Sequence, residues 1–172
     1  RIYKTYQEMA EKEASRSDGI DVVSIVTPSH LHVPVAKIFA DVGINIICDK
    51  PLALTSEEAI ELKNIIENRK LIFALTHNYT GYPMIRHARS LIQKGDLGSI
   101  RVIQAEYPQD WLTTKVEDSG LKQAEWRTDP NRSGRGGCIG DIGTHAFNLI
   151  RFVSRLEVEE LSSDIHTFVK GR

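Results

Sequence analysis

Apolar residues in the first half of the chain fall into three short, nearly continuous runs. They are DVVSIVT at 21–27, INIIC at 44–48 and LIFALT at 71–76. Short runs rich in β-branched residues and ended by polar residues, Gly or Pro are typical of strands buried on both faces of a parallel sheet. Helical spacing of apolar residues lies between them, at 33–42 and 55–68. This order predicts βαβ units on a parallel sheet.

Residues that cap or break helices mark the boundaries of these elements. A first helix is predicted over 3–15, because helix formers and charged residues dominate there before Gly19 ends the pattern. Thr55 is predicted to cap the helix that follows the second strand. Glu58, three residues later, would complete a capping box with Thr55.

The pattern changes after His77. Residues 82–93 have helical spacing, whereas 100–107 and 157–169 alternate between apolar and polar residues and are predicted to be strands with one wet face. The region 109–135 between them is long and polar, and it is predicted to be an irregular functional loop.

The two patterns predict two domains. Residues 1–79 are expected to form an α/β domain on a parallel sheet. Residues 80–172 are expected to form part of an α+β domain with an open, mainly antiparallel sheet.

Composition narrows the class of protein. The chain has 172 residues, of which 41% are hydrophobic and 26% charged, and its net charge is −1. This neutral balance gives no reason to expect a nucleic-acid or membrane partner, and no apolar run approaches the roughly 20 residues that span a bilayer. Cys48 and Cys138 lie in apolar contexts, and we expect both to be core thiols of a cytoplasmic protein.

The segment from Gly136 to His145, GGCIGDIGTH, is the first candidate for chemistry. Glycines open it, and an apolar-periodic run to about Ser154 follows, so it is predicted to be a loop that enters a helix. Asp141 and His145 are four residues apart and would share one helix face, where a carboxylate can orient an imidazole that moves protons near neutral pH. The alternative is an acidic first helical turn with a chance histidine.

Lys50 is the second candidate. It follows the run at 44–48, at the carboxyl edge of a parallel sheet, which is where ligands bind in open α/β sheets. Pro51 disfavours a helical conformation for Lys50 and sets the bend there. The alternative is an ordinary solvated lysine at the end of a strand.

Three motifs occur in order along the chain. They are Thr27-Pro28-x-x-x-His32, then Asp49-Lys50-Pro51, then Gly136-Gly137-x-x-x-Asp141-x-Gly143-x-His145 preceded by Trp126-Arg127. With these motifs the chain resembles the middle of a Gfo/Idh/MocA-type oxidoreductase, the glucose–fructose oxidoreductase and inositol dehydrogenase family. The resemblance extends over essentially all residues. Asp49 replaces the family's Glu, and Asn148 stands where many relatives have Asp.

The resemblance implies a partial Rossmann-like sheet. The three strands would be equivalent to strands 4, 5 and 6 of the six-stranded dinucleotide-binding sheet, which are neighbours in it. The glycine-rich GxGxxG turn of that fold is absent, so we expect an internal fragment that lacks this half. The fragment alone is expected to bind a dinucleotide weakly or not at all.

The resemblance also implies an activity. An NAD(P)-dependent dehydrogenase of CH–OH groups would transfer a hydride between the nicotinamide and a hydroxyl-bearing carbon of a sugar or cyclitol. His145 would take the hydroxyl proton, Asp141 would bind the substrate or orient the site, and Lys50 would be the electrostatic partner and proton relay.

Further residues are implied on the cofactor and substrate sides. NAD or NADP would be contacted by Thr27 and Pro28 at the nicotinamide–ribose crevice, with His32 nearby, Asp49 at a ribose hydroxyl and Asn78 at the nicotinamide end. Sugar contacts are predicted at Gln109, Trp111, Trp126 and Arg127, since indole faces suit the C–H side of a sugar ring and polar groups suit its hydroxyls. Trp126 as a core anchor is the alternative.

Partners and alternatives complete the hypothesis. The run 77–84 is similar to members that act on glucose-type sugars or anhydrosugars. A homo-oligomer, a dimer or tetramer, is expected through the second-domain sheet. One alternative is a non-catalytic relative or inactive fragment. Another is a metal-dependent hydrolase that uses His30-x-His32; otherwise no metal site is predicted.

Overall fold

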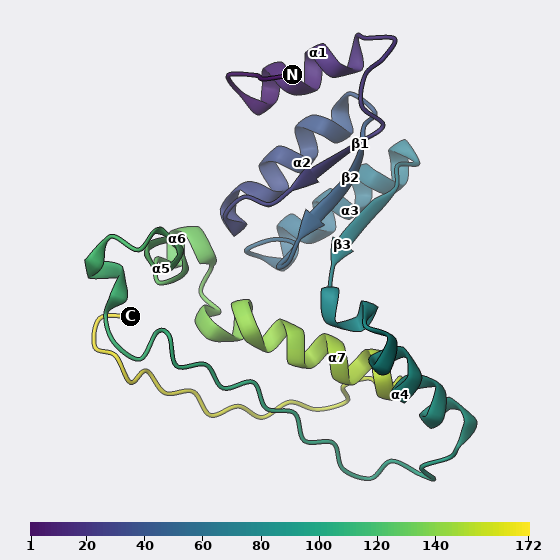
Figure 1. Ribbon diagram of the computed structural model, residues 1–172, viewed down its shortest axis with the longest axis vertical. Coiled ribbons are helices and arrows are strands. Elements are labelled where there is room, and N and C mark those ends of the chain that lie inside the picture. The colour runs from purple at the N-terminus through teal and green to yellow at the C-terminus, as the bar shows by residue number, and fades with distance from the viewer. The chain divides into compact units, whose positions relative to one another are not determined.

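The chain folds into two compact units, which the computed structural model describes over residues 1–172 (Figure 1). The first unit contains residues 1–76 together with 131–135, and the second contains 77–130 and 136–172. The chain passes from the first unit to the second at His77.

The first unit alternates helices and strands. In chain order its elements are α1 (Tyr6–Ala14), β1 (Val22–Ile25), the 3₁₀ turn η1 (Ser29–Leu31), α2 (His32–Asp41), β2 (Asn45–Asp49), α3 (Ser56–Arg69) and β3 (Phe73–Thr76). The short helix α6 (Pro130–Ser133) spans the point where the chain returns to this unit.

The three strands form one parallel sheet in the order β1-β2-β3. In its register Val23 lies opposite Ile46, and Ile46 lies opposite Phe73. The predicted parallel sheet and its run of neighbouring strands are confirmed. Each strand begins one or two residues later than its apolar run, because flanking apolar residues are not all paired in the ladder.

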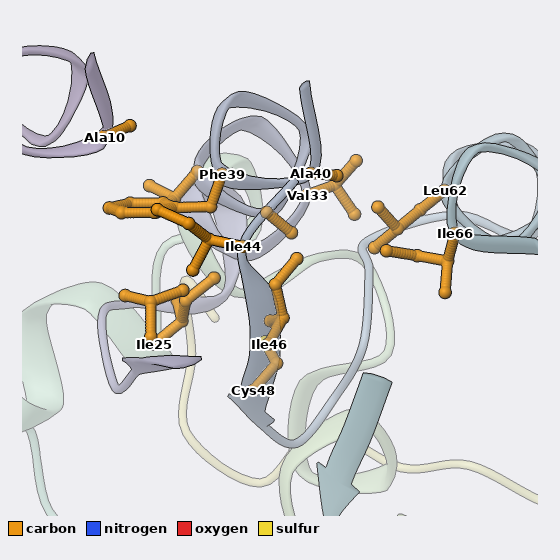
Figure 2. Close-up of a cluster of buried hydrophobic side chains, with 13 residues drawn as sticks. Ala10, Ile25, Val33, Phe39, Ala40, Ile44, Ile46, Cys48, Leu62 and Ile66 are labelled. Atoms are coloured by element: carbon orange, nitrogen blue, oxygen red, sulfur yellow. The ribbon is translucent and has the colours of Figure 1, made fainter. Parts of the chain in front are cut away.

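The core lies on one face of this sheet (Figure 2). Alternate strand residues, Ile25 from β1 and Ile46 and Cys48 from β2, are at most 2% exposed. They pack with Phe39 of α2 and Leu62 of α3, which are each 1% exposed. The helices α2 and α3 also contact each other, so both cover the same face of the sheet.

The other face of the sheet corrects the prediction of strands buried on both sides. Val22 of β1 is 45% exposed and Ile47 of β2 is 37% exposed. The physical reason is that the helices between the strands both lie on the first face, so nothing within these residues covers the second face. A continuous apolar run therefore identified the strands correctly but did not indicate which faces this chain buries.

Caps fix the ends of the helices. The Thr55 hydroxyl accepts the amide of Glu58 at 3.2 Å, as predicted for an N-cap. The Glu58 carboxylate accepts the amide of Leu54 at 3.0 Å, so the reciprocal bond forms one residue earlier than in a standard capping box. Gly95, with φ of 80°, follows the helix α4 (Pro83–Lys94) in the left-handed conformation that glycine tolerates best.

The second unit is built from helices and extended segments. Its elements are the 3₁₀ turn η2 (Asn78–Gly81), α4 (Pro83–Lys94), the 3₁₀ turn η3 (Val116–Ser119), α5 (Lys122–Arg127), the π-helical turn η4 (Ile139–Gly143) and α7 (Thr144–Ser154). α4 packs against α7, where the Arg89 guanidinium lies 4.4 Å from the centre of the Phe152 ring.

Three predictions for this unit are corrected. Residues 100–107 and 157–169 run as extended chain with no strand pairing, so the unit contains no antiparallel sheet (Figure 1). Alternation of apolar and polar residues gives a segment one apolar side, but a strand also needs a neighbouring backbone for its hydrogen bonds. Without such pairing, Val102 and Phe168 remain 85% and 94% exposed. The region 109–135 contains η3, α5 and α6 rather than an uninterrupted loop.

Two smaller findings concern the cysteines and the helix lengths. Cys48 is buried as predicted. Cys138 is exposed and corrects the prediction of a core thiol, because it lies at the first turn of the helical segment that enters η4, on its surface. None of the helices combines the length and the apolar character needed to cross a membrane.

Candidate functional site

The predicted site residues fall into two groups, one in each unit. Lys50, Thr27, Pro28, His32 and Asp49 belong to the first unit. The remaining residues, in the second unit, are Asn78, Gln109, Trp111, Trp126, Arg127, Asp141 and His145.

Lys50 immediately follows β2, the middle strand. Its amide donates to Oδ1 of Asp49 at 3.1 Å, and the same oxygen accepts the Thr76 hydroxyl at 2.6 Å. Thr76 ends β3, and it lies opposite Asp49 in the register. The Asp49 carboxylate therefore ties the backbone at Lys50 to the neighbouring strand, and the Lys50–Pro51 peptide bond that follows is cis.

The end of β1 lies beside this turn. His32, the first residue of α2, is 1% exposed, and its ring faces two carbonyl oxygens. Nδ1 is 2.6 Å from the oxygen of Pro51, and Nε2 is 2.8 Å from the oxygen of Thr27. Both ring nitrogens thus have backbone partners, so the imidazole links the turns that follow β1 and β2.

Two polar atoms near the end of β1 are buried without a hydrogen-bond partner. They are Oγ1 of Thr27 and Nδ1 of His30. Unsatisfied buried polar atoms typically cost about 1–3 kcal/mol each, and they often mark places where a bound group supplies the missing partner.

The metal-dependent alternative finds little support in these contacts. Both nitrogens of His32 already face carbonyl oxygens. A His30-x-His32 site would have to break these contacts before a metal could bind. No group of three or more His, Cys, Asp and Glu side chains in the chain is arranged to hold a metal ion.

In the second unit, Asp141 and His145 lie where a π-helical turn joins α7. Asp141 is within η4, and His145 is the second residue of α7. The predicted helix is confirmed as α7, but the expected glycine loop before it is largely helical. Gly140 and Gly143 lie within η4, which winds more widely than an α-helix. Such π-helical turns are rare and frequently occur at functional sites.

An arginine from α5 holds the Asp141 carboxylate. Nε of Arg127 donates to Oδ2 of Asp141 at 3.0 Å, and the two side chains are 24% and 21% exposed. The Arg127 Nη1 also donates to the backbone oxygen of Gln123 at 3.1 Å. An anchored guanidinium in partly buried surroundings fixes both the charge and the direction of the carboxylate.

The predicted substrate residues gather around this arginine. The guanidinium carbon of Arg127 lies 4.1 Å from the Trp126 ring centre and 5.8 Å from that of Trp111. The Trp111 indole donates to Oε1 of Gln109 at 3.2 Å. The structure therefore brings Gln109, both tryptophans and Arg127 into one cluster, which we call the Arg127 cluster. The Trp126 ring is half-buried and stacks on the Arg127 guanidinium.

His145 is surrounded by aromatic rings that the sequence reasoning did not assign to the site. The ring centre of Tyr79 is 4.7 Å from that of His145, and the centres of Tyr107 and His77 are 6.3 Å and 6.5 Å away. The hydroxyls of Tyr79 and Tyr107 share a 2.6 Å hydrogen bond, which raises the pKa of Tyr79. In the sequence, the aromatic residues of 77–82 could have suggested a role for Tyr79. Nothing in the sequence pattern pointed to Tyr107.

The glycines of the motif have different surroundings. A Cβ at Gly136 would lie 3.1 Å from the amide nitrogen of Gly140, so the turn closes tightly on its own backbone. A Cβ at Gly140 would meet no atom within 4 Å. The backbone at Gly140 is therefore open to close approach, as the sequence reasoning expected. Asn78 begins η2, the turn that carries Tyr79.

Comparison with known protein families matches both halves of the chain. Residues 1–88 match the oxidoreductase family with an NAD-binding Rossmann fold, described for GFO/IDH/MocA proteins. Residues 85–172 match the GFO/IDH/MocA C-terminal domain. The chain belongs to the Gfo/Idh/MocA oxidoreductase family. The resemblance inferred from the three motifs is thereby confirmed.

Individual members of the Gfo/Idh/MocA family align over most of the chain. Levoglucosan dehydrogenase of Pseudarthrobacter phenanthrenivorans is 34% identical over 78% of the chain and 33% of its own length. The crystal structure of an oxidoreductase from Sinorhizobium meliloti is 48% identical, with a TM-score of 0.84, over all of this chain and 42% of that one.

An inositol dehydrogenase homolog of Azotobacter vinelandii has the same degree of structural similarity. Its complex with NAD+ is 34% identical with a TM-score of 0.84, over 89% of this chain and 39% of that one. The same homolog has been crystallised with NADH and myo-inositol. The chain thus spans less than half of the length of each of these family members.

Proposed function

We propose that the protein to which this chain belongs is an NAD(P)-dependent dehydrogenase of CH–OH groups in a sugar or cyclitol. The observation that carries the proposal is the place of Lys50. It directly follows the middle strand of a parallel sheet, in a turn held by Asp49, and open α/β sheets bind their ligands at this edge. Membership of an oxidoreductase family with an NAD-binding fold supports the same reading.

The proposed roles follow from the chemistry of alcohol oxidation. The hydroxyl proton must leave oxygen as the hydride leaves carbon, so a base and a nearby cation both favour the reaction. His145 is proposed to take the proton, and Lys50 to stabilise the developing alkoxide and relay the proton. Asp141 is proposed to orient the substrate, which suits a carboxylate that Arg127 already holds in place.

The residues present fit a nicotinamide cofactor, either NAD or NADP. When bound, this group would accept the hydride from the alcohol carbon. Thr27 and Pro28 are proposed to contact it at the end of β1, with Asp49 and Asn78 as further polar contacts. The buried Oγ1 of Thr27 and Nδ1 of His30, which have no partner, support a polar ligand at this end of the sheet.

The substrate class is inferred from the Arg127 cluster. Two indoles beside a guanidinium and an amide offer apolar faces for ring C–H groups and donors for ring hydroxyls. The names of relatives point in the same direction, since one is a levoglucosan dehydrogenase and another an inositol dehydrogenase homolog. We also propose a homo-oligomer through the second unit, in which the exposed apolar side chains of 100–107 and 157–169 would be covered.

The test uses the full-length protein with NAD+ and NADP+ and a panel of sugars, anhydrosugars and cyclitols, following formation of the reduced nicotinamide. Lys50→Ala and His145→Ala should each lower kcat by about 10²–10⁴-fold, the usual size of such effects. Lys63→Ala and His166→Ala are the matched controls, because Lys63 and His166 are 64% and 68% exposed. Near-normal turnover of both test variants would refute the assigned roles.

A second candidate concerns the chain by itself. Because it spans less than half of the matched relatives, the 172-residue chain is proposed to lack activity alone. A binding titration with NAD(H) and NADP(H), on this chain and on the full-length protein, tests this. Tight binding by both would show that these residues hold the cofactor without further chain, whereas binding by neither would favour a non-catalytic relative.

A further inference from the structure

The imidazole of His32 is buried between the turns that follow β1 and β2. It is 1% exposed and among the largest fully buried side chains of the chain. It bridges the oxygen of Thr27, five residues before it, and the oxygen of Pro51, nineteen residues after it. One side chain therefore fixes two turns that are far apart in the sequence.

Both partners of this ring are backbone carbonyls, which only accept hydrogen bonds. The nitrogen–oxygen distances of 2.6 Å to Pro51 and 2.8 Å to Thr27 are short enough for a hydrogen bond on either side of the ring. A neutral imidazole carries one N–H and satisfies one carbonyl; a ring with two N–H groups satisfies both. With one N–H the ring donates to one carbonyl and packs against the other, and with two it donates to both. A phenyl ring in the same place would donate to neither.

The same turn is held from the other side. The amide of Lys50 donates to Asp49, whose carboxylate oxygen also accepts the hydroxyl of Thr76 in β3. His32 then holds the carbonyl of Pro51, the residue after Lys50. The backbone is thus fixed on both sides of Lys50. Asp49 of β2 binds the Lys50 amide, and His32 of α2 contacts the carbonyl of Pro51.

From this arrangement we propose that His32 is a positioning residue, which sets the Lys50 turn and the Thr27 turn at a fixed spacing. The ring acts through the two carbonyls and does not itself touch the substrate or the cofactor. Its catalytic consequence rests on the proposed dehydrogenase function, in which Thr27 contacts the cofactor and Lys50 acts on the substrate. The effect of His32 on the two turns is independent of that function.

Two conservative variants separate the two contacts. The side-chain amide of Asn can replace the donor at Nδ1, and that of the longer Gln can replace the donor at Nε2. His32→Asn should therefore keep a donor beside the Pro51 oxygen and lose the contact with the Thr27 oxygen. His32→Gln should do the reverse. His32→Phe keeps the ring volume and removes both bonds.

The first measurement is amide hydrogen exchange on the full-length protein, which requires no activity. His32→Gln should speed exchange at Lys50 and its neighbours, and His32→Asn should speed exchange around Ser29 and Leu31 instead. His32→Phe should affect both segments. His30→Gln is the control, and it should leave the Lys50 segment unchanged. Uniform acceleration across the whole unit in both conservative variants would overturn the positioning role in favour of general packing.

The second measurement is steady-state kinetics of the full-length protein. His32→Gln should lower kcat about tenfold or more with a nearly unchanged KM for the cofactor. His32→Asn should mainly raise the KM for the cofactor. Equal effects of the two variants on both constants would overturn the proposal. If the exchange pattern holds but wild-type protein oxidises no sugar or cyclitol, the proposed function fails while the positioning of the turn stands.

Discussion

The guanidinium of Arg127 donates from Nε to Oδ2 of Asp141 across 3.0 Å, and this pair joins α5 to the π-helical turn before α7. Fourteen residues separate the partners in the sequence. The contact therefore connects two sequence motifs: Arg127 of the Trp126-Arg127 motif binds the carboxylate of Asp141 in the glycine-rich motif. The Arg127 guanidinium thus contacts the Asp141 carboxylate and also lies against the rings of Trp126 and Trp111.

Arg127→Ala in the full-length protein should therefore lower kcat/KM about 10–100-fold. Hydrogen bonds to charged groups contribute about 1.5–3 kcal/mol, and each 1.36 kcal/mol is a factor of ten in rate. Arg127→Lys should give an intermediate loss, because an ammonium keeps the charge but lacks the planar donor and the stacking. Arg86→Ala, which removes an exposed arginine of α4, is the control. Wild-type kinetics for Arg127→Ala would contradict this role.

Tyr107→Phe should lower the pKa of Tyr79 toward its ordinary value of 10.0. The hydrogen bond with Tyr107 is the largest cause that raises the pKa of Tyr79, and burial adds to it. Titration of ring-labelled tyrosine by NMR measures the change directly. Tyr82→Phe is the comparison, since the Tyr82 ring packs against Tyr79 at 5.8 Å but contributes only a weaker charge effect. A larger change in the Tyr79 pKa in Tyr82→Phe than in Tyr107→Phe would show that Tyr82, and not Tyr107, is the main cause of the raised pKa.

The two cysteines should react with thiol reagents at very different rates. Cys48 is 0% exposed, and burial, helped by the adjacent Asp49 charge, raises the pKa of its thiol to about 12. Cys138 is exposed. We expect one fast-reacting thiol in the native chain at neutral pH and two after denaturation, measured by mass spectrometry. Cys138→Ser should remove the fast reaction, and a fast thiol that persists in that variant would place Cys48 at the surface.

The ion pair of Glu117 and Arg172 should make the second unit sensitive to acid. The Arg172 guanidinium lowers the pKa of Glu117 from 4.5 to about 2. A carboxyl group with a depressed folded-state pKa stabilises the fold fully above its unfolded pKa, and this contribution is lost as pH falls through the folded value. The loss should therefore occur between about 4.5 and about 2.

Denaturant unfolding of wild type and Glu117→Gln across a pH series checks this window. The variant should be less stable at neutral pH, and the difference should shrink as pH falls toward 2. Glu160→Gln, at an exposed site, should follow wild type throughout. A difference that stays constant with pH would attribute the effect of Glu117 to packing.

The sequence predicted the elements of the first unit well for a simple reason. An apolar run such as 44–48 indicates that the segment is buried, and its β-branched residues favour an extended backbone. The cap at Thr55 is equally local, since it depends on an amide three residues away. Such short-range signals require no knowledge of the rest of the fold.

Longer-range relationships could not be predicted in this way. The hydroxyls of Tyr79 and Tyr107 meet across 28 residues of sequence, and no spacing rule connects them. The alternating segment 100–107 has the composition of a strand, but whether it pairs depends on which backbone lies beside it. For His32, the motif predicted the right region, while only the fold reveals that its ring faces two carbonyls.

The one-sided cover of the sheet has a consequence for mutational tolerance. Polar replacements at Val22 or Ile47, which are 45% and 37% exposed, remove little buried surface from these 172 residues. The same replacements become costly wherever additional polypeptide shields that face. Comparing the loss of unfolding free energy in the two contexts would therefore show how far other polypeptide covers this face. A substitution that these 172 residues tolerate can still destabilise a protein in which the face is covered.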